Sequence, residues 1–474
     1  MVESNIFEKL KRTGWRTSIT PYLKWSMAAM LVLGFASGLP LMMVFSKLSF
    51  WLREVGIERS TIGGLYAVSF AYSLKFLWAP VVDGVHLPIL SGLGQRRSWM
   101  ALAICGTILG LSLIGLSDPA TALRLTVIGA LILAFSGATL DIAVDAWRIE
   151  SAPDDEQANM AAVYILGYRL AIMFAGFSMV LAGYSSFNLA YLVMAIAMAV
   201  ILTIVIFVIK EPSQEHLIPK EYAATASYLS HIRRIIFEPF WQFLARYGVW
   251  LIAISGIVTL YRISDFTMGV MASPFYADLG YSAQTVGWIQ GIFGPWPIVL
   301  GGFLGGFIAV KFRLLPALLW GAGLTLLTNG AFAALALAAG PGLDAAANGV
   351  QGALVNTPNK WALLGVILAD NLAAGYVGAV FIAYLSSLVD RQFAATQYAL
   401  LSSAYSFFCK LVATATSGPL AETVGWAQFF LITALYTIPP ALIILYLMHY
   451  GPDWLTGKST PPLENDSQAK TAKA

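Results

Sequence analysis

Charged side chains are scarce in this chain of 474 residues, where Asp, Glu, Lys and Arg make up only 11%. A soluble domain carries about a quarter of its residues charged, so a water-soluble fold is excluded. The net charge of +3 is small and spread through the loops, which leaves no basic patch for binding nucleic acid.

Cysteine, histidine and the motifs of enzyme chemistry are also rare. Cys105 and Cys409 lie inside apolar runs and are too few for a disulfide framework or a metal cluster. The four histidines are scattered beyond any metal-ligand spacing. The chain contains no His-Glu-x-x-His, Cys-x-x-Cys, Walker-type or Gly-x-Ser-x-Gly motif. We therefore expect no enzyme activity, no metal site and no cofactor.

Apolar residues, by contrast, make up 58% of the chain, and the mean hydropathy is +0.73. Apolar runs of roughly 20 residues recur throughout, and in hydrocarbon only helices and closed barrels satisfy their backbone groups internally. The runs are continuous rather than alternating, which favours helices. The first run begins near Ser26 and reaches about Leu48, too long for a cleaved signal peptide. We predict an all-α membrane protein that crosses the bilayer many times.

About twelve runs are long enough to span a bilayer. They lie at 26–48, 60–82, 99–117, 123–146, 159–183, 188–209, 247–271, 284–309, 314–338, 361–387, 394–418 and 426–448. The longest internal hydrophilic stretch divides them into two groups of six. The expected parts are an N-terminal segment at 1–25, a six-helix bundle at 26–210, an inter-bundle loop at 211–246, a second six-helix bundle at 247–449 and a disordered polar tail at 450–474.

Lys and Arg collect on one side of this twelve-span arrangement, and such clusters mark cytoplasmic loops. The residues are Lys9, Lys11, Arg12, Arg16, Lys24, Arg96, Arg97, Lys210, Lys220, Arg233, Arg234, Lys311, Arg313 and Arg391. Arg53 and Arg59 are exceptions in the opposing loops, which hold no comparable cluster. Both termini, the inter-bundle loop and the tail are thus expected in the cytoplasm.

The two groups of spans resemble each other in sequence. WLREVG at 51–56, leading to TIG at 61–63, is echoed by FYADLG at 275–280, leading to TVG at 285–287. Both patterns follow the first span of their group. Internal repeats of this kind are typical of transporters.

Ionisable residues occur within the predicted spans, where a charge costs on the order of 3 kcal/mol or more. Each should therefore face a cavity or a partner, although a fixed ion pair or an interfacial position is the alternative for any one of them. The residues concerned are Lys47, Lys75, Asp141, Asp145, Arg169, Arg262, Asp265, Asp370 and Lys410.

Three sets of residues in or near the predicted spans have distinct predicted roles. For gating between helices we predict Asp83, Arg96, Arg97, Asp141, Asp145 and Arg148, because Asp141 and Asp145 share one helical face near other cytoplasmic charges. As substrate contacts we predict cations, an amide and rings, which suit carboxylates, hydroxyls and sugar faces. They are Lys75, Tyr72, Arg169, Tyr168, Arg262, Tyr261, Asn371, Tyr398 and Lys410.

The third set is a pair of candidate proton carriers, Asp265 and Asp370. A carboxyl group away from water holds its proton more readily, because desolvation disfavours the charged form. Arg262 and Asp265 are three apart in one span and are expected to neutralise one another. With no ATP site, transport would run on an ion gradient or downhill.

Several motifs together point to a family. They are GFASGLP at 34–40, KFLWAP at 75–80, GQRRSW at 94–99, DIAVDAWR at 141–148, GYRL at 167–170, YRISD at 261–265, DNL at 370–372 and ATQYALL at 395–401. Over almost its whole length the sequence resembles the AmpG muropeptide permease family of the major facilitator superfamily. It lacks the two further C-terminal spans of some members.

The resemblance implies a major facilitator fold of two pseudo-symmetric six-helix bundles in a bacterial inner membrane. It also implies proton-driven import of anhydro-muropeptides (GlcNAc-anhydroMurNAc-peptides) for cell-wall recycling, and a link to β-lactamase induction. The expected partners are an anionic sugar-peptide, protons and the lipid bilayer, and the expected state is a monomer.

Two other functions fit parts of the pattern. A related permease for a siderophore or an acyl-CoA-like anionic metabolite shares the general motifs. A non-transporting membrane scaffold or sensor is the alternative from another class, but a scaffold has no use for buried charges that are costly to insert.

Overall fold

The structure is a computed structural model that describes residues 24–151, 157–212, 247–350, 353–389 and 394–452. Most of the expected N-terminal segment and inter-bundle loop, and nearly all of the expected tail, lie outside these residues. Within them every regular element is a helix, which confirms the predicted fold class.

Ten helices in the described part are long and apolar enough to cross a membrane. Two of the twelve predicted spans are not among them. The span predicted at 60–82 is a succession of short helices, α5 (Arg59–Leu65), α6 (Phe70–Leu74), η4 (Lys75–Leu77) and α7 (Ala79–Gly84). The span predicted at 394–418 lies in α21 (Ala394–Val424), a helix of 31 residues. The architecture is consistent with twelve spans.

The helices fall into two compact units that exchange short segments. Unit 1 comprises 1–55, 68–221 and 282–292, and unit 2 comprises 56–67, 222–281 and 293–474. The expected bundles at 26–210 and 247–449 match these units except for the exchanged segments, 56–67 and 282–292.

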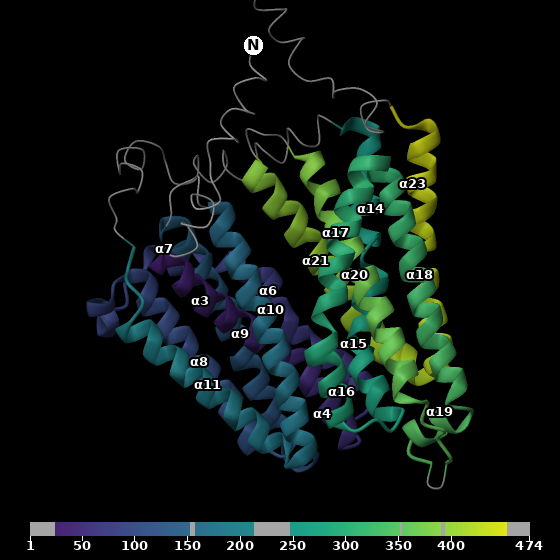
Figure 1. Ribbon diagram of the computed structural model, residues 1–474, viewed down its shortest axis with the longest axis horizontal. Coiled ribbons are helices and arrows are strands. Elements are labelled where there is room, and N and C mark those ends of the chain that lie inside the picture. Colours follow the sequence, from purple (N-terminus) through teal and green to yellow (C-terminus); the bar gives the residue numbers. More distant parts are fainter. Residues whose placement is uncertain (1–23, 152–156, 213–246, 351–352, 390–393, 453–474) are drawn as a thin grey trace, which may run out of the picture. The chain divides into compact units, whose positions relative to one another are not determined.

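Unit 1 contains the purple to blue helices of Figure 1. In chain order they include α3 (Trp25–Met42), η2 (Met43–Lys47), α4 (Leu48–Glu54), α6, η4, α7, η5 (Pro88–Leu93), α8 (Gln95–Leu116), α9 (Pro119–Ser151), α10 (Gln157–Tyr184) and α11 (Phe187–Phe207). The exchanged α16 (Ala283–Trp288) joins them.

Unit 2 contains the green to yellow helices and the exchanged α5. The others are α14 (Leu251–Leu260), α15 (Ile263–Asp278), α17 (Pro295–Phe312), α18 (Leu314–Ala338), α19 (Gly342–Ala347), α20 (Lys360–Leu388), α21, α22 (Trp426–Leu435) and α23 (Ile438–Tyr450). The π-helix η11 (Ile289–Phe293) lies at the boundary between exchanged segment and unit 2.

Small residues let the helices of each unit approach closely, as apolar packing in a bilayer requires. In unit 1 a Cβ on Gly34 would collide with the carbonyl of Tyr164, so α3 and α10 meet at their backbones. In unit 2 a Cβ on Gly301 would collide with the carbonyl of Leu372, which brings α17 against α20.

Several spans are interrupted part-way across. The first span contains the π-helix η2, and the eighth contains the π-helix η11. In the seventh span, Tyr261 and Arg262 form a turn between α14 and α15. Interrupted helices in membrane transporters commonly lie beside the transported solute, and π-helical turns mark functional sites. The polar side chains next to these breaks are therefore candidates for contact with a solute.

Candidate functional site

In unit 1 the ammonium group of Lys75 lies between two carboxylates. Its Nζ is 3.6 Å from Oδ2 of Asp141 and 3.7 Å from Oδ2 of Asp145. Residues four apart on a helix share one face, so α9 presents both carboxylates together. The short helix η4 places Lys75 opposite them. Lys75, Asp141 and Asp145 thus form one group, the Lys75 cluster. It brings together a predicted substrate contact and two predicted gating residues.

The Lys75 cluster extends inward from the Asp141 side chain, which is 15% exposed. Among the described residues, Oδ1 of Asp141 and the hydroxyl of Tyr72 are buried and have no hydrogen-bond partner. The rings of Tyr164 and Tyr168 on α10 are 6.3 Å apart, and both hydroxyls interact electrostatically with Asp141. Buried polar atoms without partners are costly, so this cluster has spare capacity for a ligand group, a proton or water.

Arg169 follows Tyr168 on α10 and is half-buried. Within the described residues it forms no ion pair, in contrast to Lys75. An unpaired guanidinium in a membrane span suits an anionic ligand.

The other predicted gating residues of unit 1 hold the ends of helices. The guanidinium of Arg96 pairs with Glu150 of α9 at 2.6 Å, and Nε of Arg148 is 4.0 Å from Asp145. The side chain of Asp83 lies outside the described residues. Arg148 therefore extends the Lys75 cluster, whereas Arg96 belongs to a separate pair.

Glu211 is a residue that sequence reasoning missed. Its carboxylate accepts hydrogen bonds from the backbone N–H groups of Arg96 and Arg97, at 2.7 and 3.0 Å. These N–H groups lie in the first turn of α8, where a carboxylate is favoured by the helix dipole. The guanidinium of Arg97 in turn donates to the carbonyls of Val205 and Ile206 at the end of α11. In the sequence, the sole indication of this contact is that an acidic residue follows the sixth predicted span.

In unit 2 the interrupted seventh span places an ion pair at its break. Nε of Arg262 is 3.2 Å from Oδ2 of Asp265, which confirms the predicted pairing of these residues. Neither atom makes a hydrogen bond of good geometry, so the two charges attract without being aligned. Thr325 of α18 donates to the other carboxylate oxygen of Asp265 at 3.4 Å. The two residues therefore form an ion pair in which these two atoms are not hydrogen-bonded.

Asp370 of α20, the second predicted proton carrier, lies in the same region of unit 2. It interacts with the hydroxyl of Thr328 and electrostatically with Asp265. Its neighbour Asn371 donates to the carbonyl of Gly294 at 3.1 Å, directly before α17 begins. Asn371 is thus engaged at the interruption of the eighth span.

The remaining predicted substrate contacts of unit 2 lie in different surroundings. Tyr261 is 4% exposed, donates to the carbonyl of Leu318 at 2.8 Å and stacks on Phe381. Tyr398 packs against the same apolar core, and Lys410 is half-buried on α21. Tyr261 is accordingly a core residue, and Tyr398 lies partly buried against that core.

Two buried cations have partners that sequence reasoning did not identify. Lys47, at the end of η2, is 4% exposed and donates to Oε1 of Gln290 at 2.7 Å, within unit 1. Arg59 of α5 is 1% exposed and donates to Asn348 in unit 2. Both contacts join residues more than 240 positions apart, so no local pattern indicates them.

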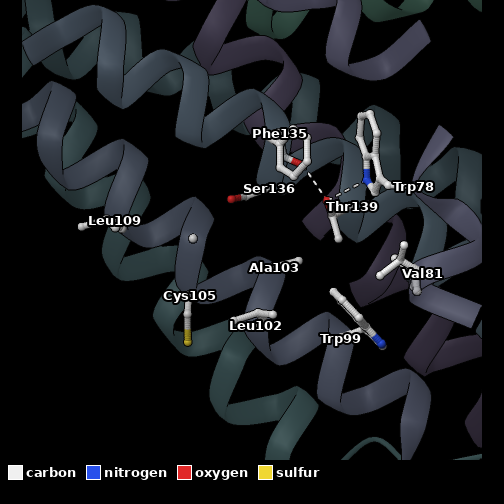
Figure 2. A pocket seen from close by; sticks show the side chains of 12 residues that line it. Trp78, Val81, Trp99, Leu102, Ala103, Cys105, Leu109, Phe135, Ser136 and Thr139 are labelled. Atoms are coloured by element: carbon white, nitrogen blue, oxygen red, sulfur yellow. Dashed lines mark hydrogen bonds between the residues drawn. The ribbon is translucent and has the colours of Figure 1, made fainter. Parts of the chain in front are cut away.

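An apolar groove between α7, α8 and α9 is a poor candidate for the solute site. Figure 2 shows its walls, in which Trp78 stacks on Phe135 and donates to Thr139. Leu109 is 51% exposed at its edge. The groove offers no charged side chain among its lining residues, as a charged solute would require. Its exposed apolar edge suits lipid chains instead.

Known proteins are similar in sequence to this chain over most of its length. The model of the Major Facilitator Superfamily matches residues 27–347. A Rickettsia conorii protein that carries the name AmpG 4 is 31% identical over 88% of this chain and 95% of its own length. The anhydromuropeptide permease of Escherichia coli is 28% identical over 88% of this chain and 79% of its own length.

Solved structures share the fold. A mutant of the nucleoside transporter NupG superposes with a TM-score of 0.64 at 13% identity, covering 89% of this chain and 99% of that one. At this identity the likeness concerns the fold alone, and it agrees with the helical architecture described above. From the family match and the sequence relatives together, the chain belongs to the AmpG family of the major facilitator superfamily.

Proposed function

We propose that this chain imports anhydro-muropeptides in symport with protons across a bacterial inner membrane, with both termini in the cytoplasm. The observation that carries the proposal is the similarity to the anhydromuropeptide permease, which extends over 88% of this chain. A scaffold would not need the buried charges of the two units, because they are costly to insert.

The chemistry of the described clusters supports an anionic sugar-peptide as the solute. Such a solute carries carboxylates, hydroxyls and an amine. Arg169 and Arg262 offer guanidinium groups to carboxylates, and the carboxylates of the Lys75 cluster suit an amine. Tyr72, Tyr168 and Asn371 add rings and an amide for the sugar. Lys410 is a further anion contact in this proposal.

Proton coupling in this proposal centres on the Arg262–Asp265 pair. While Asp265 is ionised, it competes with a substrate carboxylate for Arg262. Protonation of Asp265 removes that competitor, so the proton and the anionic substrate bind together. Asp370 is the second candidate carrier, because two nearby carboxylates do not both ionise easily.

The purified protein in proteoliposomes tests the proposal directly. With an inward proton gradient, we expect accumulation of labelled anhydro-muropeptide and loss of accumulation when a protonophore collapses the gradient. A ferric siderophore and an acyl-CoA are offered in parallel. Uptake of one of these and not of the muropeptide would contradict the proposed substrate, and uptake unaffected by the protonophore would contradict the coupling.

A further inference from the structure

Lys47 is a buried cation whose ammonium group contacts an amide and not a carboxylate among the described residues. It is the last residue of the π-helix η2 in the first span, and 4% of it is exposed. Its ammonium group carries three N–H donors. The contact with Oε1 of Gln290, at 2.7 Å, employs one of them. Among the described residues no carboxylate lies within ion-pairing distance of this group.

Two other cations of the predicted spans, both only partly buried, differ from Lys47 in this respect. Lys75 lies between two aspartates, and Arg262 is paired with Asp265. Burying an ammonium group with only a neutral amide as acceptor leaves most of its charge uncompensated. The Lys47 site therefore has unfilled capacity for an anion.

Gln290 lies on a segment that is attached to the other unit. Residues 282–292 belong to unit 1, but the chain continues from Phe293 into α17 of unit 2. Close contacts hold the segment on α10, since a Cβ on Gly287 would be 2.7 Å from Cβ of Met179. Transporters of this kind work by movement of one bundle against the other. Such a movement would displace the segment 282–292. The amide of Gln290, which covers Lys47, would then move with it.

We propose that Lys47 binds a carboxylate of the transported solute, and that Gln290 occupies the same position when no solute is bound there. The amide oxygen of Gln290 stands in for a carboxylate oxygen, at a normal hydrogen-bond distance. Departure of Gln290 uncovers the ammonium group, and a solute carboxylate replaces a neutral acceptor by a charged one. Charge-assisted hydrogen bonds are roughly twice as strong as neutral ones, so the exchange favours the solute. This inference rests on the proposed function, because it assumes an anionic solute.

The test compares two substrates in proteoliposomes prepared from the full chain. One is the labelled anhydro-muropeptide, and the other is the same compound with its peptide carboxylates converted to amides. Lys47→Met keeps an unbranched side chain that is one heavy atom shorter, and it removes the charge. We expect it to raise KM for the carboxylate substrate by roughly tenfold or more, and to leave KM for the amide within about twofold.

A second pair of variants keeps Lys47 in place. Gln290→Glu supplies a permanent carboxylate to the ammonium group, so we expect the same selective rise in KM. Gln290→Leu is the matched control, because it uncovers Lys47 without adding a competing charge, and it should not raise KM for the carboxylate substrate. Folding of all three variants is checked by their elution as single species in detergent.

The outcomes separate this inference from the proposed function. If the wild-type protein takes up neither muropeptide form, the proposed function fails and the inference fails with it. If the wild-type protein transports but Lys47→Met raises KM equally for both substrates, Lys47 is only a structural contact. Wild-type kinetics for Gln290→Glu with the carboxylate substrate would also overturn the inference.

Discussion

The guanidinium of Arg59 lies 5.0 Å from the centre of the Trp426 ring and donates to the carbonyl of Ala421 at 2.6 Å. The same group donates to Asn348 at 2.7 Å and lies 3.9 Å from Asp344. These partners come from α19, α21, α22 and the residue after α19, all in unit 2. Arg59 therefore fixes the exchanged helix α5 to that unit.

Replacing Arg59 should destabilise the protein markedly. Arg59→Met leaves the Asn348 and Ala421 oxygens without their donor and removes the cation from the Trp426 ring. We expect a loss on the order of 3 kcal/mol, the usual cost of breaking a buried charged interaction. Thermal unfolding in detergent measures it, with Arg124→Met at an exposed position as the control. Equal melting temperatures for the two variants would show that Arg59 is not an anchor.

Asp265→Asn tests the proposed proton coupling. In the wild-type protein, substrate affinity should rise as the pH falls, because protonation of Asp265 removes the competitor for Arg262. The asparagine variant cannot ionise, so its affinity should vary little with pH. It should also lose gradient-driven accumulation but retain counterflow of substrate. Uptake and counterflow measured at several pH values provide the comparison.

The control for this variant is Asp118→Asn in the exposed turn before α9. Asp118 accepts a hydrogen bond from the N–H of Ala120, and asparagine preserves such a contact. It should behave as the wild type throughout. If Asp265→Asn still accumulates substrate normally, Asp370 is the remaining candidate proton carrier. Asp370→Asn then tests that residue in the same way. Normal accumulation by both would contradict the coupling proposed for these carboxylates.

The Lys75 cluster predicts a measurable coupling energy. Lys75→Met leaves Asp141 and Asp145 facing one another without a cation, which should destabilise the protein. The combined variant Lys75→Met with Asp141→Asn removes the repulsion and should recover part of the loss. Because Lys75 is 33% exposed, solvent screening limits the coupling to roughly 1 kcal/mol. Denaturation of the single and double variants measures it, and strictly additive effects would argue against a direct interaction.

The sequence allowed prediction of the features that depend on local periodicity. Asp141 and Asp145 share a face because they are four apart, and Arg262 pairs with Asp265 because they are three apart on one span. The helical type of the spans followed from the hydrophobic runs in the same way, and ten of the twelve predicted spans are helices long and apolar enough to cross a membrane in the described part of the chain. These are properties of single helices, which the bilayer favours regardless of their neighbours.

Contacts between distant segments could not be predicted from these patterns. Lys75 has no acid near it in sequence, and its partners lie on α9, a helix that packs against the short helices around it. The span predicted at 60–82 is a succession of short helices, and its residues belong to two different units. Arg59 seemed from sequence to be an ordinary loop residue, although it is almost fully buried. Tertiary packing determines each of these three features, and the hydrophobic pattern of the sequence does not predict such packing.

The glycines of the Arg59 region offer a test of helix packing in unit 2. A Cβ on Gly418 would collide with the backbone carbonyl of Arg59 and lie 2.7 Å from Cα of Ser60. Because both obstacles are backbone atoms, α5 and α21 would have to separate. Gly418→Ala should therefore destabilise the protein, although alanine is favoured over glycine within a helix by about 1 kcal/mol.

Gly323 of α18 provides the matched control for that variant. It is an exposed helical glycine in the same unit, and a Cβ there would meet nothing within 4 Å. Gly323→Ala should leave the melting temperature unchanged or raise it slightly, whereas Gly418→Ala should lower it. If the same glycine-to-alanine change lowers the melting temperature at Gly418 and raises it at Gly323, the destabilisation at Gly418 comes from the contact between helices. If both variants raise the melting temperature, α5 does not pack on α21 as closely as described.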